Sequence, residues 1–195
     1  MNTKPVVTQM DQLLGSLGFT RQKMTWNRKV GLFVDVVDLQ PSKTGDALTV
    51  NAGVLHPGVH KVCWGDDAPV FVEEPTCTVR ARIGQLLDGK DLWWRDDGEN
   101  VASEIVEQVR AHVVPFVDRM HSVEALAKQL KCFGVTKQKY PPPIICLAVL
   151  MWENGDVAGA NALLNELRKQ TLGAWQTKVA DVIERLARLR SQRPQ

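Results

Sequence analysis

The sequence lacks the features of a secreted, membrane-inserted or metal-stapled protein. No stretch approaches the about 18 uninterrupted apolar residues of a membrane span, and residues 1–19 contain no apolar segment of a signal peptide. The four cysteines are scattered, and no pair has the two-residue spacing that presents two thiolates to zinc or to a redox partner. We therefore expect a cytoplasmic protein with reduced, buried thiols and no membrane partner.

A strong net charge is also missing. The formal charge of the 195 residues is +2, which gives no global field to attract nucleic acid or acidic lipid. The local distribution is uneven, because residues 65–107 carry eleven acids and four bases, whereas residues 119–195 carry twelve bases and six acids. We expect no nucleic-acid partner and an acidic middle segment that attracts a basic one.

Enzyme and cofactor signatures are absent as well. The sequence contains no phosphate-binding P-loop, no dinucleotide fingerprint and no G-x-S-x-G nucleophile motif. None of its four histidines stands in a recognisable pair with a serine or cysteine nucleophile. We therefore predict a protein that is not an enzyme and needs no cofactor.

What is present in the first half is a mixture of helical and strand patterns. Apolar residues recur at helical spacing from Val6 to Leu17, after Thr3 as a candidate N-cap. Residues 48–54 alternate between apolar and polar, as in a strand that buries one face and offers Asn51 on the other. Residues 77–83 alternate in the same way and place their two arginines away from the core.

The second half has helical periodicity throughout. We expect Pro115 to kink or end one helix near His112, and Ser122 to cap the next. The run of prolines in residues 137–143 predicts a stiff, extended connector. Three further helical patterns follow it, over residues 144–152, 157–167 and 175–189.

These patterns predict an α+β fold with two parts. Residues 1–121 form an α+β domain with an N-terminal helix, and residues 122–195 form a C-terminal helical layer packed on it.

One group of metal-ligand types occurs in the segment LHPGVHKVC. His56, His60 and Cys63 would meet a metal ion only if this segment were helical, and Pro57 and Gly58 argue against a helix. We interpret the segment as a surface turn and predict no metal site.

An enzyme alternative rests on three residues at the end of a predicted strand. Asp35, Asp38 and Lys43 distantly match the two acids and lysine of metal-dependent nucleases. Side chains three apart on one strand point to opposite faces, which argues against a shared site. A metal-dependent hydrolase or nuclease stays as an alternative.

Four short motifs carry a family resemblance: GFTRQKMTWNR, VDLQPSK, LTVNAGVL and CTVRARIGQLLDGKDLWW. Across about the first 120 residues, they resemble a bacterial family known as a domain of unknown function, numbered forty-three-oh-four. The resemblance implies an α+β fold on a curved antiparallel sheet. Some members of that family occur beside secreted toxin systems and are regarded as immunity proteins.

The matching positions divide into apolar and polar residues. Phe19, Trp26 and one of the two adjacent tryptophans are expected in the core. The polar positions are harder to explain by packing, and they are Gln40, Ser42, Asn51, Arg82 and Asp91. They either meet a partner or form an internal network in which Arg82 pairs with Asp91.

The sequence therefore predicts a protein-binding module, most simply an immunity protein that neutralises a basic toxin domain. The expected partner-binding residues are Gln40, Ser42, Asn51, Arg82, Asp91, Trp94, Asp96 and Asp97. Trp93 or Trp94 would anchor the interface, and an acidic set would steer the partner. That set is Asp66, Asp67, Glu73, Glu74, Asp96, Asp97 and Glu99. A second alternative is a helical adaptor that works through residues 144–190.

Overall fold

The computed structural model describes residues 2–95 and 100–192, which divide into two compact units. Unit 1 comprises Met1–Leu55 and Pro69–His121, and unit 2 comprises His56–Ala68 and Ser122–Gln195. One of the divisions falls between His121 and Ser122. Residues 56–68, which the sequence assigns to the first domain, belong instead to unit 2.

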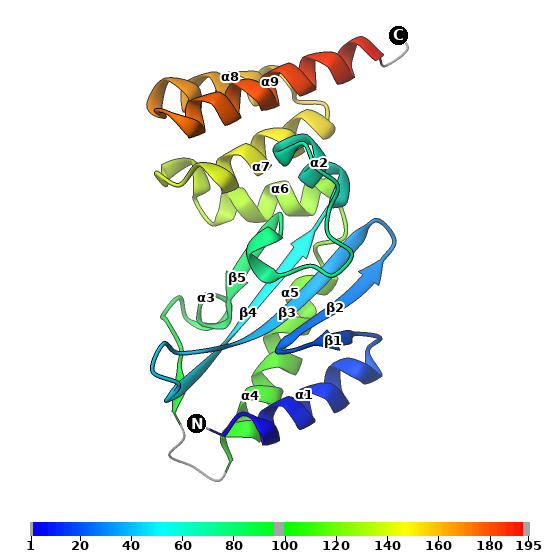
Figure 1. The fold of residues 1–195 in the computed structure, drawn as a ribbon, viewed down its shortest axis with the longest axis vertical. Helices are drawn as coiled ribbons and strands as arrows, with labels where there is room; N and C mark the ends of the chain where they lie inside the picture. The colour runs from blue at the N-terminus through cyan, green and yellow to red at the C-terminus, as the bar shows by residue number, and fades with distance from the viewer. Residues whose placement is uncertain (1, 96–99, 193–195) are drawn as a thin grey trace. The chain divides into compact units, whose positions relative to one another are not determined.

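Unit 1 contains an antiparallel sheet, so the predicted α+β class is confirmed. Its strands run in the order β1-β2-β3-β4-β5, and the short β6 also pairs with β4. Figure 1 shows β2, β3 and β4 side by side. The strands are β1 (Thr20–Gln22), β2 (Thr25–Val30), β3 (Phe33–Pro41), β4 (Ala47–Leu55), β5 (Val79–Arg82) and β6 (Trp94–Arg95).

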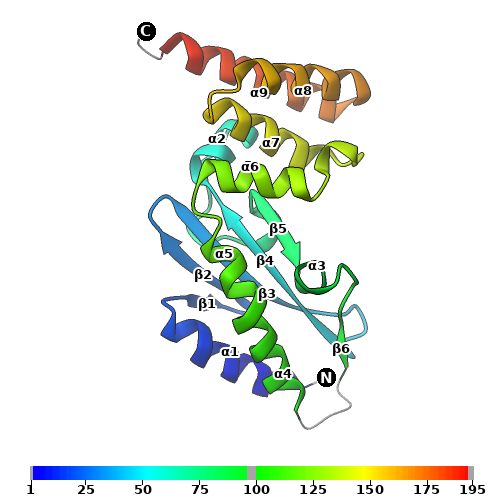
Figure 2. The same cartoon turned by 180° about the vertical axis from the view of Figure 1, so that it is seen from behind.

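Helices cover the apolar face of this sheet. α4 (Val101–Gln108), a π-helical turn (Val109–Val113) and α5 (Val114–Asp118) follow one another, and Figure 2 shows α4 and α5 in front of β3 and β4. The N-terminal helix α1 (Lys4–Ser16) packs against α4. Side chains from three strands form the core beneath the helices: Trp26, Val37, Leu39, Val50 and Ala52.

Of the two outcomes predicted for Pro115, a kink or an end of the helix near His112, the end does not occur. The π-helical turn Val109–Val113 lies just before it, and the helix continues through α5 to Asp118. A π turn shifts the hydrogen-bond ladder by one residue, so the chain passes a proline that has no N–H to donate.

A loop covers one end of the opposite face of the sheet. Asn27 of β2 donates to Val72 O at 2.9 Å and accepts from Val72 N at 2.6 Å. A Cβ on Gly53 would lie 2.6 Å from Cys77 Sγ, so only glycine lets this loop approach β4. The short helices η1 (Glu74–Thr76) and α3 (Ile83–Leu87) flank β5. The strand predicted over residues 77–83 is shorter in the structure, where β5 spans only Val79–Arg82 and Ile83 already begins α3.

Unit 2 is helical. α7 (Pro141–Glu153) packs against α6 (Val123–Cys132) and α8 (Val157–Gln170), as Figure 1 also shows. The remaining elements are α2 (Pro57–Trp64), η3 (Val135–Lys137) and α9 (Ala174–Gln192). Ser122 caps α6 as predicted, since its Oγ accepts from Ala125 N at 3.0 Å. Within the described ranges, no helix combines the length and apolar character that a membrane crossing requires.

Two segments that were predicted to be irregular are helical. Residues 57–64 form α2, with Pro57 in the first turn and His56 Nδ1 accepting from Val59 N at 3.2 Å. Pro141 likewise begins α7 after Tyr140, so the predicted connector over residues 137–143 is wrong for the three prolines, while residues 138–140 are non-helical. Proline is tolerated in a first turn because its missing N–H would have no partner there.

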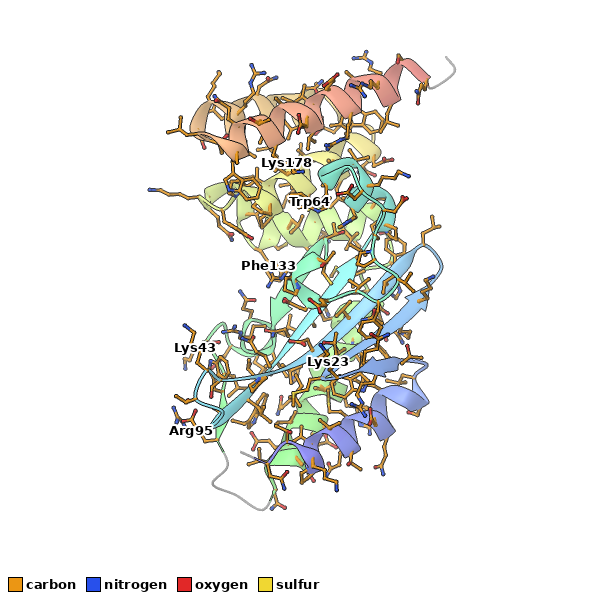
Figure 3. The ribbon with its side chains drawn as sticks, viewed as in Figure 1. Lys23, Lys43, Trp64, Arg95, Phe133 and Lys178 are labelled. Atoms are coloured by element: carbon orange, nitrogen blue, oxygen red, sulfur yellow. The ribbon has the colours of Figure 1, made fainter. Side chains whose placement is uncertain are left out.

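Basic side chains of α9 hold the C-terminal end of α2. Arg185 Nη1 donates to Val62 O at 2.9 Å, and Lys178 Nζ donates to Trp64 O at 3.2 Å. Figure 3 shows Lys178 beside Trp64, whose ring centroid lies 5.7 Å from the ammonium group. Cations at a helix C-terminus satisfy its free carbonyls and oppose its dipole.

Candidate functional site

A polar cluster lies on the sheet face that the helices do not cover. The register pairs Asp38 of β3 with Asn51 of β4, and Asn51 with Arg82 of β5. Gln40 shares this face because alternate residues of a strand point the same way. Three predicted partner-binding residues, Gln40, Asn51 and Arg82, are therefore brought together on the strands, and a fourth, Asp91, bonds to Arg82. With Asp38 and Trp93 we call these four residues the polar cluster.

Asn51 is the centre of the hydrogen bonds in this cluster. Its Nδ2 donates to Gln40 Oε1 at 2.8 Å and to Asp38 Oδ2 at 3.2 Å. Its Oδ1 accepts from Arg82 Nε at 3.3 Å. Thr25 of β2 completes the row, since its Oγ1 donates to Asp38 Oδ1 at 2.9 Å. The side chains are thus held in place before any ligand arrives.

The loop after α3 adds an aromatic ring and a carboxylate. Arg82 Nη1 donates to Asp91 Oδ1 at 2.9 Å, and Trp93 Nε1 donates to Asp91 Oδ2 at 2.9 Å. The Arg82 guanidinium lies 5.2 Å from the Trp93 ring centroid, a cation-π distance. The hydrogen bonds from Arg82 and Trp93 lower the pKa of Asp91. A Cβ on Gly84 would lie 1.8 Å from Lys90 O, so glycine is required where this loop turns back.

The cluster is closed at its centre and open at one edge. Asn51 is 6% exposed, whereas the side chains of Arg82 and Asp91 are 33% and 57% exposed. Thr49 lies two residues before Asn51 and therefore on the same face. Its buried Oγ1 has no hydrogen-bond partner among the described residues, so one polar group beside the cluster is unsatisfied.

Ser42 does not join the cluster. It lies in the turn between β3 and β4, where its Oγ donates to Asp46 Oδ1 at 2.7 Å and accepts from Ala47 N at 3.2 Å. The hydroxyls of Thr44 and Ser42 lower the pKa of Asp46 to about 2. Arg95 also bonds to Asp46, and Figure 3 shows Arg95 and Lys43 near this turn. Ser42 therefore has a structural role in the turn.

Trp94 does not lie on the polar face either, which corrects its predicted role as an anchor. It is 5% exposed, and its Nε1 donates to Glu104 Oε1 at 2.8 Å. Of the two adjacent tryptophans, Trp94 is the core residue, and Trp93 is the one beside Arg82. The predicted partner-binding residues Asp96 and Asp97 lie outside the described residues, as does Glu99.

The other acids of the predicted steering set do not form one group. Asp66 and Asp67 belong to unit 2, whereas Glu73 and Glu74 belong to unit 1. Glu74 is buried and makes a bidentate ion pair with Arg80, with contacts of 2.7 and 2.8 Å. The acidic segment of the sequence is therefore divided between the two units.

The three residues of the nuclease alternative do not converge. Asp38 lies in the polar cluster, Asp35 points to the helix-covered face, and Lys43 is exposed in the turn after β3. In the part of the chain that the structure describes, no three histidine, cysteine or acidic side chains could together hold a metal ion. His56 and His60 do not belong to such a group of metal ligands among the described residues either. Burial lowers the pKa of each histidine.

Asp35 belongs to a buried ionic cluster that the sequence reading missed, formed with Arg28, Asp118 and His121. Arg28 Nε and Nη2 donate to Asp35 Oδ2 at 2.9 and 2.7 Å, and His121 Nε2 lies 2.8 Å from Asp35 Oδ1. Arg28 Nη2 also contacts Asp118. Counting outward from the turn between Val30 and Phe33 pairs Arg28 with Asp35, so this contact had a signal in the sequence.

Comparison with known proteins gives one match. A family model described as a domain of unknown function (DUF4304) matches residues 10–119. This range includes all six residues of the polar cluster. No curated protein and no solved structure matches the chain significantly.

Proposed function

This chain belongs to the DUF4304 family of domains of unknown function, and we propose that its family domain is a protein-binding module that meets its partner at the polar cluster. The observation that carries the proposal is the partly exposed pair of Arg82 and Trp93, held beside a row of ordered polar side chains. Arginine and tryptophan are the residue types most enriched at the energetic centres of protein interfaces.

The order within the cluster supports recognition. Gln40, Asn51 and Arg82 are already hydrogen-bonded to one another, so a partner would not have to immobilise them on binding. Immobilising a long side chain costs about 0.5–1.5 kcal/mol, and a preformed surface avoids much of that loss.

The protonation of the cluster also favours binding over proton-transfer chemistry. Its two carboxylates are engaged, Asp38 by Thr25 and Asn51, and Asp91 by Arg82 and Trp93. A general base works best with a pKa near the operating pH, and the pKa of Asp91 is shifted the other way.

We further propose that the partner is a toxin domain, so that the chain acts as an immunity protein. This step rests on the family resemblance of the motifs around Trp26, Asn51 and Arg82. A basic partner is the class to which an acidic segment would contribute a faster encounter. The acidic residues of that segment are divided between the two units, so they do not form one steering surface. The polar cluster is therefore the main structural support for partner binding.

The test first reads the open reading frames beside the gene of this chain, and uses the C-terminal domain of a secreted protein encoded there as the toxin candidate. Arg82→Ala and Trp93→Ala should each weaken binding about 30-fold or more in calorimetry, as loss of an interface centre does. Both variants should also fail to protect cells that express the toxin.

Trp175→Ala is the matched control, because Trp175 is a partly exposed tryptophan of unit 2. Unchanged binding by this variant is expected. If Trp175→Ala abolished binding while Arg82→Ala and Trp93→Ala did not, the polar cluster would be excluded, and the helical adaptor alternative would be favoured.

A further inference from the structure

Two of the four cysteines, far apart in sequence, meet inside unit 2. Cys63 of α2 and Cys146 of α7 have their Sγ atoms 4.0 Å apart. Cys63 is fully buried, and Cys146 is 6% exposed. Both sulfurs are thiols, as are those of Cys77 and Cys132. The sequence predicted four buried thiols; Cys63, Cys77 and Cys146 are buried, whereas Cys132 is exposed.

The short helix α2 is fixed close to α7 by other contacts. Arg185 and Lys178 of α9 bond to the last carbonyls of α2, and α2 also packs on α7. A disulfide needs its sulfurs about 2.05 Å apart, so the sulfurs must approach by about 2 Å. Rotation about the side-chain bonds of two cysteines changes the distance between their sulfurs by amounts of this size.

We propose that Cys63 and Cys146 form a reversible disulfide when the protein is exposed to a peroxide. The Cys146 thiolate, the less buried of the two, attacks one oxygen of hydrogen peroxide, and the O–O bond breaks. The hydroxide that leaves takes up the proton that the thiol released, so a sulfenic acid and one water form. The Cys63 sulfur then attacks the sulfenic sulfur, the S–O bond breaks, and the hydroxyl leaves as a second water. Two thiols are oxidised, and one peroxide is reduced to two waters.

The environment of the two cysteines determines how fast the disulfide forms. Burial and the contact with Cys146 raise the pKa of Cys63, so the thiolate is scarce at neutral pH. The interior position also admits a small oxidant more readily than a bulky one. The disulfide should therefore form slowly and selectively.

The bond would fix α2 in unit 2. It joins Cys63, in the segment His56–Ala68, to the C-terminal part of the chain that completes this unit. A crosslink between residues so far apart in sequence restricts the unfolded chain strongly, and its stabilising effect increases with loop length. We expect the melting temperature to rise by about 5 °C or more.

The test treats the full chain with hydrogen peroxide, blocks remaining thiols under denaturing conditions, and maps the peptides by mass spectrometry. The expected product is a peptide pair joined through Cys63 and Cys146, which a dithiol reductant separates. A variant with Cys77→Ser and Cys132→Ser should give the same product, because neither residue belongs to the pair.

The matched contrast is Cys132, which is exposed and has no thiol neighbour among the described residues. If peroxide oxidised Cys132 while Cys63 and Cys146 both stayed free, the proposal would be overturned. A disulfide that instead joined Cys132 to a second molecule would overturn it as well. Because the wild-type chain gives these readouts, they do not depend on whether Cys63→Ser folds.

Discussion

The sheet of unit 1 carries two charged clusters on opposite faces, and they differ in how far water reaches them. The side chain of Asp35 in the buried ionic cluster is 0% exposed, whereas that of Asp91 in the polar cluster is 57% exposed. Each carboxylate accepts from an arginine of a neighbouring segment at 2.7–2.9 Å. The bonds are alike, and the surroundings differ.

This difference decides what each cluster can contribute. An ion pair in water is worth about 0–1 kcal/mol, because solvent screens the charges and already solvates them. A buried charge that loses its partner is expensive, because nothing replaces the lost bonds. The buried ionic cluster is therefore committed to the fold, while the polar cluster can exchange its contacts with those of a partner.

Replacing Asp35 should have the largest effect. Asp35→Ala takes two hydrogen bonds from the guanidinium of Arg28, whose side chain is 15% exposed, and leaves Asp118 as its acidic partner; it also removes the carboxylate beside His121. We expect the free energy of unfolding to fall by about 3–5 kcal/mol, measured by urea denaturation.

Asp91→Ala is the matched control, since it removes an exposed carboxylate bonded to a partly exposed arginine. The free energy of unfolding of this variant should fall by less than about 1 kcal/mol. Equal losses for the two variants would contradict the contrast between the faces.

The two adjacent tryptophans provide an intermediate effect. Trp94→Phe removes a buried indole that donates to Glu104. We expect the free energy of unfolding to fall by about 1–3 kcal/mol, because the acceptor is left unpaired and side-chain volume is lost. Trp93→Phe should change stability by less than about 0.5 kcal/mol, as for other partly exposed positions. Thermal unfolding of both variants measures the difference, and a reversed order would place Trp93 in the core.

The parts of the fold that could be predicted from the sequence are those that depend on near neighbours in the chain. The strands β3 and β4, the helix α1 and the Ser122 cap follow from local patterns, because alternation, periodicity and capping act between near neighbours. The two errors at Pro57 and Pro141 share one cause. Each proline was taken as a helix breaker, yet each stands where its missing N–H is tolerated.

The candidate site was predicted only in part. Asn51 and Arg82 were placed on a polar face by alternation alone, and the structure pairs them directly. Which tryptophan faces the core depends on the pairing of Trp94 with Leu48 in a two-residue strand, a contact that no local pattern reveals. The contact between Asp35 and His121 joins residues 86 positions apart, so it too required the fold.

The smallest effect concerns the titration of Asp91. Its pKa is lowered from the ordinary 3.8 by the hydrogen bonds from Arg82 and Trp93. A carboxylate with a lowered folded pKa contributes its stabilisation fully above the unfolded value and loses it as the pH falls through the folded one. The contact should therefore be intact at pH 5 and above, and break only below about pH 3.8. The indole N–H resonance of Trp93 should shift with a midpoint below that value, while in Asp91→Asn it should stay constant over the same range. A midpoint above 3.8 would mean that Asp91 is not held by Arg82 and Trp93, and the polar cluster would lose its aromatic edge.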